Sequence, residues 1–499
     1  MPKVRRAGRM RLVALASCCA GLAIGAVGVG LGAGAAAPAP APQAQPALDW
    51  LAGQLAANGG SLPPSFGAGT DWGLTADAVL AFTSAGRATD PAAVTATDLL
   101  TANAAAFTTW SSGGATVRDA GATGKLVLAL RSMGRPATAQ GVDLEAELRS
   151  LMETSGAQAG RFSDDVPDPA WNASNGFGQS LSMLGLALTP GGIPAPSVTF
   201  LLAQQCPAGG FRLNYLATAG CTDDAQADTD ATALALSALL AVSPRSTDVA
   251  TALDRGTSWV LARQAADGSF TGTGPTAGAN ANSTGLISQY LRAAGRTQAA
   301  DLGAAWIVGC CQLTTANASG TPAAGQVGAI GYGPTALSAA LVDGVTTQTG
   351  DQWRRTTSQA VLALGLAPYG PVDVAPLAPS PTTTSTGPTG TSTTVTSTTV
   401  TSTTTDPTST TSTTTPTTSS SIPASTTTAS VQGQQLVDSG IDIDGGSYSA
   451  GGTSGGSSSG SGSALAITGG DPAPLLTAAI LLLALGAVLS TTTERRGRP

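Results

Sequence analysis

Two aspartates, Asp228 and Asp230, stand two residues apart at the head of an Ala/Leu-rich stretch, QADTDATALALSALLA. Carboxyl groups are candidate proton donors in catalysis. The same residues also suit the start of a helix, where Asp228 would cap free N–H groups and Asp230 would lie favourably in the helix dipole. Polar residues recur at comparable positions elsewhere, which favours the helix start.

Other aspartates precede the same helix or the one before it. If the helices close into a ring, their starts surround one mouth, and these carboxylates could form an acidic rim. The rim could bind a cation or a glycan, or carry paired carboxylates for glycosidase or lyase chemistry. The aspartates could equally be solvated loop residues. The catalytic candidates are Asp228, Asp230, Asp164 and Asp165, the wider rim adds Asp168, Asp223 and Asp224, and Trp72, Trp110, Trp171 and Tyr215 could stack against sugar.

The chain contains no histidine. This excludes Ser-His-Asp and Cys-His nucleophile pairs as well as histidine-containing zinc sites. The sequence also lacks Cys-x-x-Cys, so we predict no metal and no cofactor. The net charge of -7 and the lack of clustered Lys or Arg outside the termini argue against nucleic-acid binding.

Two helical patterns recur between residues 48 and 371 about every 50 residues, as in repeat proteins. Amphipathic stretches with an aromatic residue, such as SVTFLLAQQ and GTSWVLARQ, predict outer helices. Stretches rich in Ala, Leu and Ser predict inner ones, because small residues allow close approach. We therefore predict an all-α fold, a single α/α toroid of about six helix pairs, with an open helical stack as the alternative. The predicted inner helices lie within residues 71–86, 119–134, 174–188, 228–241, 280–295 and 332–344.

One outer stretch, RGTSWVLARQAADGSF, resembles the QW repeat of the squalene cyclase and prenyltransferase superfamily. The matching residues are Trp259, Gln264, Gly268 and Phe270, and Phe200, Gln205, Gly209 and Phe211 repeat the core of the motif. Phe stands where the family usually has Trp, and near Trp306 Cys311 occupies the Gln position with Gln312 one residue later. The motif is structural in that family, so the resemblance implies the toroid and little about catalysis.

The stretch Asp228-Thr229-Asp230-Ala231-Thr232-Ala233 resembles the Asp-x-Asp-Asp-Thr-Ala motif of class II terpene cyclases. By that resemblance Asp230 would be the acid that protonates an alkene. Ala231 replaces the last aspartate, the supporting histidine is missing, and the domain has few aromatic residues to stabilise a carbocation. A terpene cyclase-type enzyme is therefore the remote alternative.

Four cysteines lie in this domain, where an oxidising compartment would allow them to pair. We expect a Cys206–Cys221 disulfide, because the two residues bracket one loop. Cys310 and Cys311 could form a vicinal pair or remain free thiols, and cross-pairing between the two sites is an alternative.

The two ends predict export and anchoring. Residues 1–37 have the basic, apolar and small-residue order of a signal peptide, and a Pro/Ala linker follows at 38–47. Residues 475–493 predict a transmembrane helix, and the basic tail 494–499 should stay in the cytoplasm. The motif Leu465, Ala466, Ile467, Thr468 and Gly469 resembles a sortase cell-wall sorting signal of high-GC Gram-positive bacteria. The resemblance implies cleavage after Thr468, with sortase and peptidoglycan as partners; a retained membrane anchor is the alternative.

Between the domain and this motif, residues 372–464 are rich in Thr, Ser and Pro and then in Gly and Ser. They contain too little apolar surface to offset the entropy of folding, so we predict a disordered stalk. The sequence thus predicts an extracytoplasmic, anchored toroid that binds or displays a small molecule or glycan without catalysis. The main alternative is a carboxylate-dependent glycan hydrolase or lyase.

Overall fold

The computed structural model describes residues 40–65, 67–112, 114–215 and 220–372. These residues belong to a single unit of the chain and are mainly α-helical. The signal peptide, sorting motif, transmembrane helix and basic tail predicted from the sequence lie outside the described residues, as does the stalk beyond Val372. Among the described helices, none is long and apolar enough to cross a membrane.

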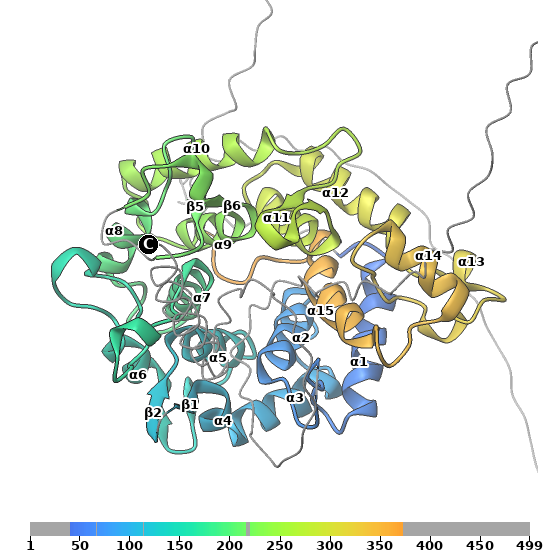
Figure 1. Ribbon diagram of the computed structural model, residues 1–499, viewed down its shortest axis with the longest axis horizontal. Helices are drawn as coiled ribbons and strands as arrows, with labels where there is room; N and C mark the ends of the chain where they lie inside the picture. The colour runs from blue at the N-terminus through green and yellow to red at the C-terminus, as the bar shows by residue number, and fades with distance from the viewer. Residues whose placement is uncertain (1–39, 66, 113, 216–219, 373–499) are drawn as a thin grey trace, which may run out of the picture. The chain divides into compact units, whose positions relative to one another are not determined.

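The inner helices of the described chain form a closed ring (Figure 1). Each contacts the next along the sequence, and the last contacts the first. The predicted toroid is therefore confirmed over the described residues, and an open stack is excluded because the two ends of the array meet. In chain order the ring comprises α2 (Trp72–Ser84), α5 (Ala120–Ser132), α7 (Gly176–Ala187), α9 (Thr229–Leu240), α11 (Ala281–Ala293) and α15 (Gly350–Ala360).

Further helices surround this ring (Figure 1). Most of them pack against an inner helix, as α10 does on α9 and α12 on α11. Their buried side chains are mostly Ala, Leu and Val, which give each outer helix one apolar face. The outer set comprises α1 (Ala44–Ala57), α3 (Pro91–Ala102), α4 (Ala104–Thr108), α6 (Leu144–Ser150), α8 (Ala195–Ala203), α10 (Thr247–Leu261), α12 (Thr297–Cys310), α13 (Thr315–Ala318) and α14 (Pro334–Asp343).

Small residues allow the inner helices to approach closely. A Cβ added at Gly124 of α5 would lie 2.2 Å from the Ser182 hydroxyl of α7. At Gly285 of α11 it would lie 2.3 Å from the carbonyl oxygen of Gln359 in α15. Larger side chains at these positions would push the helices apart.

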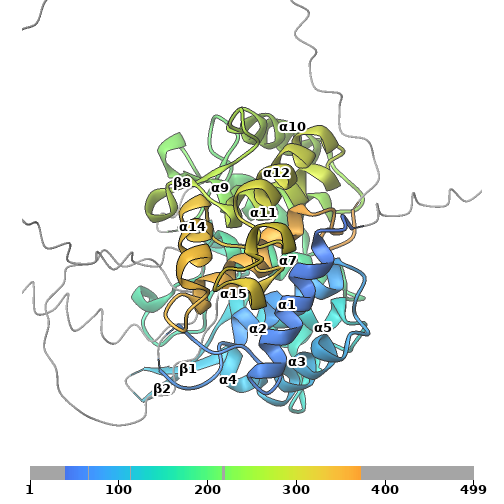
Figure 2. The same ribbon diagram turned by 90° about the vertical axis from the view of Figure 1, so that its right-hand side faces the viewer.

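Short antiparallel hairpins precede several inner helices. β1 (Thr109–Ser112) pairs with β2 (Ala115–Arg118) before α5, β5 (Phe211–Arg212) with β6 (Ala227–Asp228) before α9, and β7 (Thr271–Gly272) with β8 (Gly278–Ala279) before α11. A further hairpin, β3 (Thr138–Ala139) with β4 (Val142–Asp143), leads into α6. In Figure 2, β1, β2, β8 and α14 lie on one side of the ring. We call this side, where the inner helices start, the N-terminal face.

Glutamine side chains join one outer helix to the next. Gln205 Nε2 donates to Gly209 O at 2.9 Å in its own loop and to Ala252 O of α10 at 2.8 Å. Gln264 makes the same two bonds, to Gly268 O at 3.1 Å and to Ala299 O of α12 at 2.8 Å.

The last of these links closes the outer layer. Gln312 Nε2 donates to Gly328 O at 3.4 Å and to Gln43 O, just before α1, at 2.9 Å. Gln312 therefore occupies the position that Gln205 and Gln264 hold, one residue later than their spacing would place it. The extra residue lies in the Cys310–Cys311 pair, which forms a vicinal disulfide.

The expected disulfide between Cys206 and Cys221 is also present.

Two sequence-based predictions about the fold need correction. Residues 332–344 were predicted as an inner helix, but α14 is peripheral and only Ala340 is buried in it. The inner position belongs to α15, GDQWRRTTSQA, whose buried polar side chains hid it from an apolar pattern. The domain also starts before residue 48, because α1 begins at Ala44 and both Ala44 and Ala47 are fully buried.

The segment after α15 covers the C-terminal end of the ring. Ala367 N donates to Ser84 O at 2.8 Å, and Gln289 Nε2 donates to Ala367 O at 2.6 Å. Tyr369 is buried, and Gly370 lies against Leu184 of α7 and Ala241 after α9. In Figure 1 this orange segment runs from α15 toward α9. The N-terminal face is therefore the end of the ring that this segment leaves uncovered.

Candidate functional site

A repeated cap starts five of the inner helices. In each, an Asp or Asn side chain accepts hydrogen bonds from N–H groups of the first turn, as N-cap residues do. Asp228 accepts from Asp230 N at 3.0 Å and from Ala231 N at 2.8 Å. The caps are Asp71, Asp119, Asn175, Asp228 and Asn280.

A second polar residue follows most of these caps by four positions and fixes the preceding segment. The Thr232 hydroxyl accepts from Phe211 N at 2.8 Å, and that of Thr284 accepts from Phe270 N at 3.0 Å. Thr75, Gln179 and Thr357 accept equivalent bonds from Leu62, Phe162 and Ile330. These polar residues therefore hold α2, α7, α9, α11 and α15 to loops that precede them in the chain.

Asp230 differs from these structural residues. It is 1% exposed, and its Oδ2 accepts from the Ser283 hydroxyl of α11 at 3.1 Å, while its Oδ1 has no hydrogen-bond partner among the described residues. Burial, and then the neighbouring Asp228, raise the pKa of Asp230 well above its ordinary value. Burial also raises the pKa of Asp228, against the opposing effect of the N–H bonds that it accepts. Asp230 is thus a buried carboxyl that favours the protonated form.

Asp164 is paired with Asp119, a residue that the sequence analysis did not propose as part of a site. Asp164 accepts from Ala120 N at 3.0 Å and from Ala173 N at 2.9 Å, while Asp119 accepts from Ala122 N at 2.8 Å. Burial and the neighbouring Asp164 raise the pKa of Asp119 to about 8. Burial also raises the pKa of Asp164, although its N–H bonds oppose the rise. The pair therefore holds the α5 start to the loop before α7.

The remaining residues of the predicted rim are bound locally. Asp165 forms an ion pair with Arg118 at 2.7 Å. Asp168 and Asp223 each cap a short 3-10 helix, and Asp224 accepts from Ala208 N at 2.6 Å. Among the described residues, no hydrogen bond or ion pair joins the Asp164 group to the Asp228 group. Each of these carboxylates therefore has its own local contacts, and Asp165, Asp168, Asp223 and Asp224 remain exposed.

Tryptophans remain accessible on the same face. Trp72 begins α2, Trp110 lies in β1 before α5, and Trp171 ends a 3-10 helix before α7; all three are partly exposed. Tyr215, which the sequence also suggested, is 4% exposed and packs edge-to-face on Phe200 with ring centroids 5.1 Å apart. Tyr215 therefore cannot stack against a ligand in this conformation.

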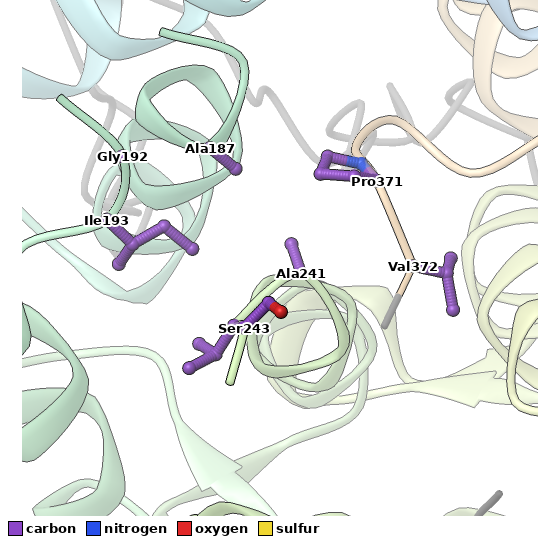
Figure 3. A pocket seen from close by; sticks show the side chains of 8 residues that line it. Ala187, Gly192, Ile193, Ala241, Ser243, Pro371 and Val372 are labelled. Carbon is purple, nitrogen blue, oxygen red and sulfur yellow. The ribbon is translucent and has the colours of Figure 1, made fainter. Parts of the chain in front are cut away.

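Neither a metal site nor the described cavity coincides with these residues. No cluster of three or more potential metal ligands occurs within the described ranges. A cavity of about 310 Å³ lies at the opposite end of the ring, lined by Ala187, Gly192, Ile193, Ala241, Val242, Ser243, Pro371 and Val372 (Figure 3). Its lining contains no side chain that could act as a general acid or base.

The chain is similar to several solved structures, all at low identity. A protein from Actinoplanes is 20% identical over 64% of this chain and 97% of that one, with a TM-score of 0.41. An unsaturated glucuronyl hydrolase from Bacillus sp. GL1, responsible for glycosaminoglycan degradation, is 14% identical over 66% and 98%, with a TM-score of 0.43. An ent-copalyl diphosphate synthase from Streptomyces platensis is 19% identical over 59% of this chain and only half of its own, with a TM-score of 0.35.

No protein-family model and no curated protein sequence matches the chain. The structural similarities are too low to assign an activity, so the functional argument rests on the chain's own residues.

Proposed function

We propose that the protein is anchored at the cell surface, with its ring on the outer side of the membrane. We further propose that the N-terminal face of the ring binds a ligand and does not catalyse its conversion. One contrast on this face carries the proposal: tryptophans are partly exposed, while the candidate carboxylates are engaged in caps, ion pairs or buried contacts. A glycosidase requires two carboxyl groups that flank the bond to be broken. Asp164 and Asp230 are buried, Asp228 caps α9, and Asp165 is paired with Arg118.

The tryptophans favour a ligand with flat apolar surfaces, such as a glycan. A Trp ring offers a large apolar face and one N–H donor, which suits stacking against a sugar ring. Trp72 begins α2, Trp110 precedes α5 and Trp171 precedes α7, so the three tryptophans come from consecutive inner-helix starts. We propose that an extended ligand contacts all three.

Binding of the full chain to purified cell-wall glycan tests this proposal. We expect Trp72→Ala, Trp110→Ala and Trp171→Ala each to weaken binding about tenfold, equivalent to about 1.4 kcal/mol. Trp306→Ala is the matched control, because Trp306 is also partly exposed but lies on the outer helix α12. Equal losses in all four variants, or release of glycan fragments by the wild type, would contradict a non-catalytic binding face.

Acid chemistry at Asp230 is the second candidate function, because this carboxyl is buried, favours its protonated form and has one oxygen without a described partner. It would serve a carboxylate-dependent glycan hydrolase or lyase or, more remotely, a terpene cyclase-type enzyme. Asp228, Asp230, Asp164 and Asp165 would each be changed to Asn and assayed on wall glycans. If the wild type turns over, loss of turnover in Asp230→Asn with retention in Asp165→Asn would favour this candidate.

Anchoring is part of the same proposal and rests on the sequence motif at residues 465–469. We propose that a sortase joins Thr468 to peptidoglycan. Thr468→Ala should then move the protein from the wall to the membrane fraction, as measured by immunoblot of fractionated cells. Retention in the wall would contradict sorting and would leave the binding proposal intact.

A further inference from the structure

A buried ion pair joins two inner helices inside the ring. Lys125 Nζ of α5 lies 2.9 Å from Asp77 Oδ1 of α2, and their side chains are only 1% and 7% exposed. Two charges withdrawn from water pay a large desolvation penalty, so a buried pair is weak evidence of stabilisation by itself. The pair therefore calls for a further explanation.

The type of cation at this position is unusual for this chain. The sequence has 23 Lys and Arg residues, of which only Lys3 and Lys125 are lysines. Lys125 is thus the only lysine among the described residues. The neighbouring buried acid Asp71 pairs instead with Arg355, which also bonds Asp351 at 2.8 Å. Arginine keeps its charge in proteins, whereas a buried lysine can lose its proton and act as a nucleophile.

The partner carboxyl is suited to react with such an amine. Burial raises the pKa of Asp77, Lys125 opposes the rise, and Asp71 adds to it. A raised pKa favours the neutral acid, which an amine can attack, over the carboxylate, which resists attack. Proton transfer from Nζ to Oδ1 across the 2.9 Å contact would give an uncharged acid beside an uncharged amine, the two forms that condense.

We propose that Lys125 and Asp77 condense to an intramolecular amide bond. The neutral Nζ attacks Cγ of the protonated Asp77, a new Nζ–Cγ bond forms, and the Cγ–OH bond breaks. The hydroxyl group leaves with one amine proton as water, so atoms balance and nothing is oxidised or reduced. The product covalently ties α2 to α5, and its burial keeps hydrolytic water away. This reaction is independent of ligand binding on the N-terminal face.

Peptide mapping of the purified full chain tests the bond. The protein is reduced, alkylated, denatured and digested with trypsin, which cleaves after unmodified Lys and Arg. We expect no release of residues 119–125, because an amide at Lys125 blocks cleavage there. Residues 119–131 should instead remain joined to the peptide that ends at Arg87, with a mass one water below the sum of the two. Fragment ions should place the junction at Asp77 and Lys125.

Lys125→Arg is the matched control, since it keeps the positive charge and the trypsin site but has no amine that can form this amide. We expect this variant to release residues 119–125 completely and to lose the joined peptide. Complete release of residues 119–125 from the wild type would overturn the proposal even if the variant failed to fold. Persistence of the joined peptide in Lys125→Arg would also overturn it.

Discussion

The starts of α5 and α9 each hold two carboxyl groups, but they satisfy them differently. At α5, Asp119 and Asp164 together accept bonds from Ala122 N, Ala120 N and Ala173 N. At α9, Asp228 accepts both N–H bonds of the cap, and among the described residues Asp230 accepts only from the Ser283 hydroxyl, on one oxygen. Buried polar groups are normally hydrogen-bonded, so the α5 pair is a structural clamp, whereas Asp230 Oδ1 has no hydrogen-bond partner in the described part of the chain.

The comparison shows that burial and a raised pKa do not by themselves indicate catalysis. Each pair contains a buried carboxyl group, and all four carboxyl groups have raised pKa values. Structural networks perturb pKa values as active sites do, and only the hydrogen-bond partners distinguish the two places. Three substitutions can test this distinction.

The largest expected effect is from Asp164→Ala. It leaves the buried Ala120 N–H without its acceptor and removes the bond to Ala173 N, which should lower the free energy of unfolding by about 3 kcal/mol. The measurement is chemical denaturation of the two proteins. Asp165→Ala is the control, because this neighbouring side chain is exposed and its ion pair with Arg118 should contribute under about 1 kcal/mol. Equal effects would mean that the α5 pair is not a clamp.

The next substitution, Asp119→Asn, should change the free energy of unfolding by an amount that depends on pH. The pKa of Asp119 is about 8 in the fold against an ordinary value of 3.8. Between these two pH values the native state therefore binds more protons than the unfolded state. Stability therefore falls as the pH rises through this window. Asn keeps the cap, as Asn175 and Asn280 do, but cannot ionise.

Thermal unfolding of wild type and Asp119→Asn at two pH values measures this difference. From pH 5 to pH 8 we expect the melting temperature of the variant to rise relative to that of the wild type, because each pH unit inside this window removes up to about 1.4 kcal/mol of stability from the wild type alone. A constant difference between them would show that the Asp119 charge does not control stability.

The smallest effect is expected from Asp230→Asn. The amide oxygen can still accept from Ser283, and within the described ranges just one oxygen of Asp230 is hydrogen-bonded in the wild type. We expect the free energy of unfolding at pH 5 to change by less than about 1 kcal/mol, measured by denaturation. If Asp230→Asn lowers the free energy of unfolding as much as Asp164→Ala does, Asp230 has a structural role, and the case for acid chemistry at this residue is weaker.

Several features of the fold followed from local sequence. The predicted caps, the small-residue helices and the QW-like spacing are short-range patterns, and the structure has α2, α5, α7, α9 and α11 at the expected places. The position of α15 did not follow, because its buried Arg355 is compensated by Asp71, 284 residues away in the chain. A local pattern of apolar residues cannot predict an ion pair between residues so far apart in the chain.

The sequence by itself therefore determined the helical repeats, the polar start of each inner helix and the lack of histidine chemistry. These depend on residue type and spacing over a few turns, where hydrogen-bond caps and apolar periodicity act. Only the tertiary structure decided which carboxylates meet, since it paired Asp164 with Asp119 and placed Lys125 against Asp77. Ring closure brings distant segments together, and burial then sets the protonation of the groups that meet there.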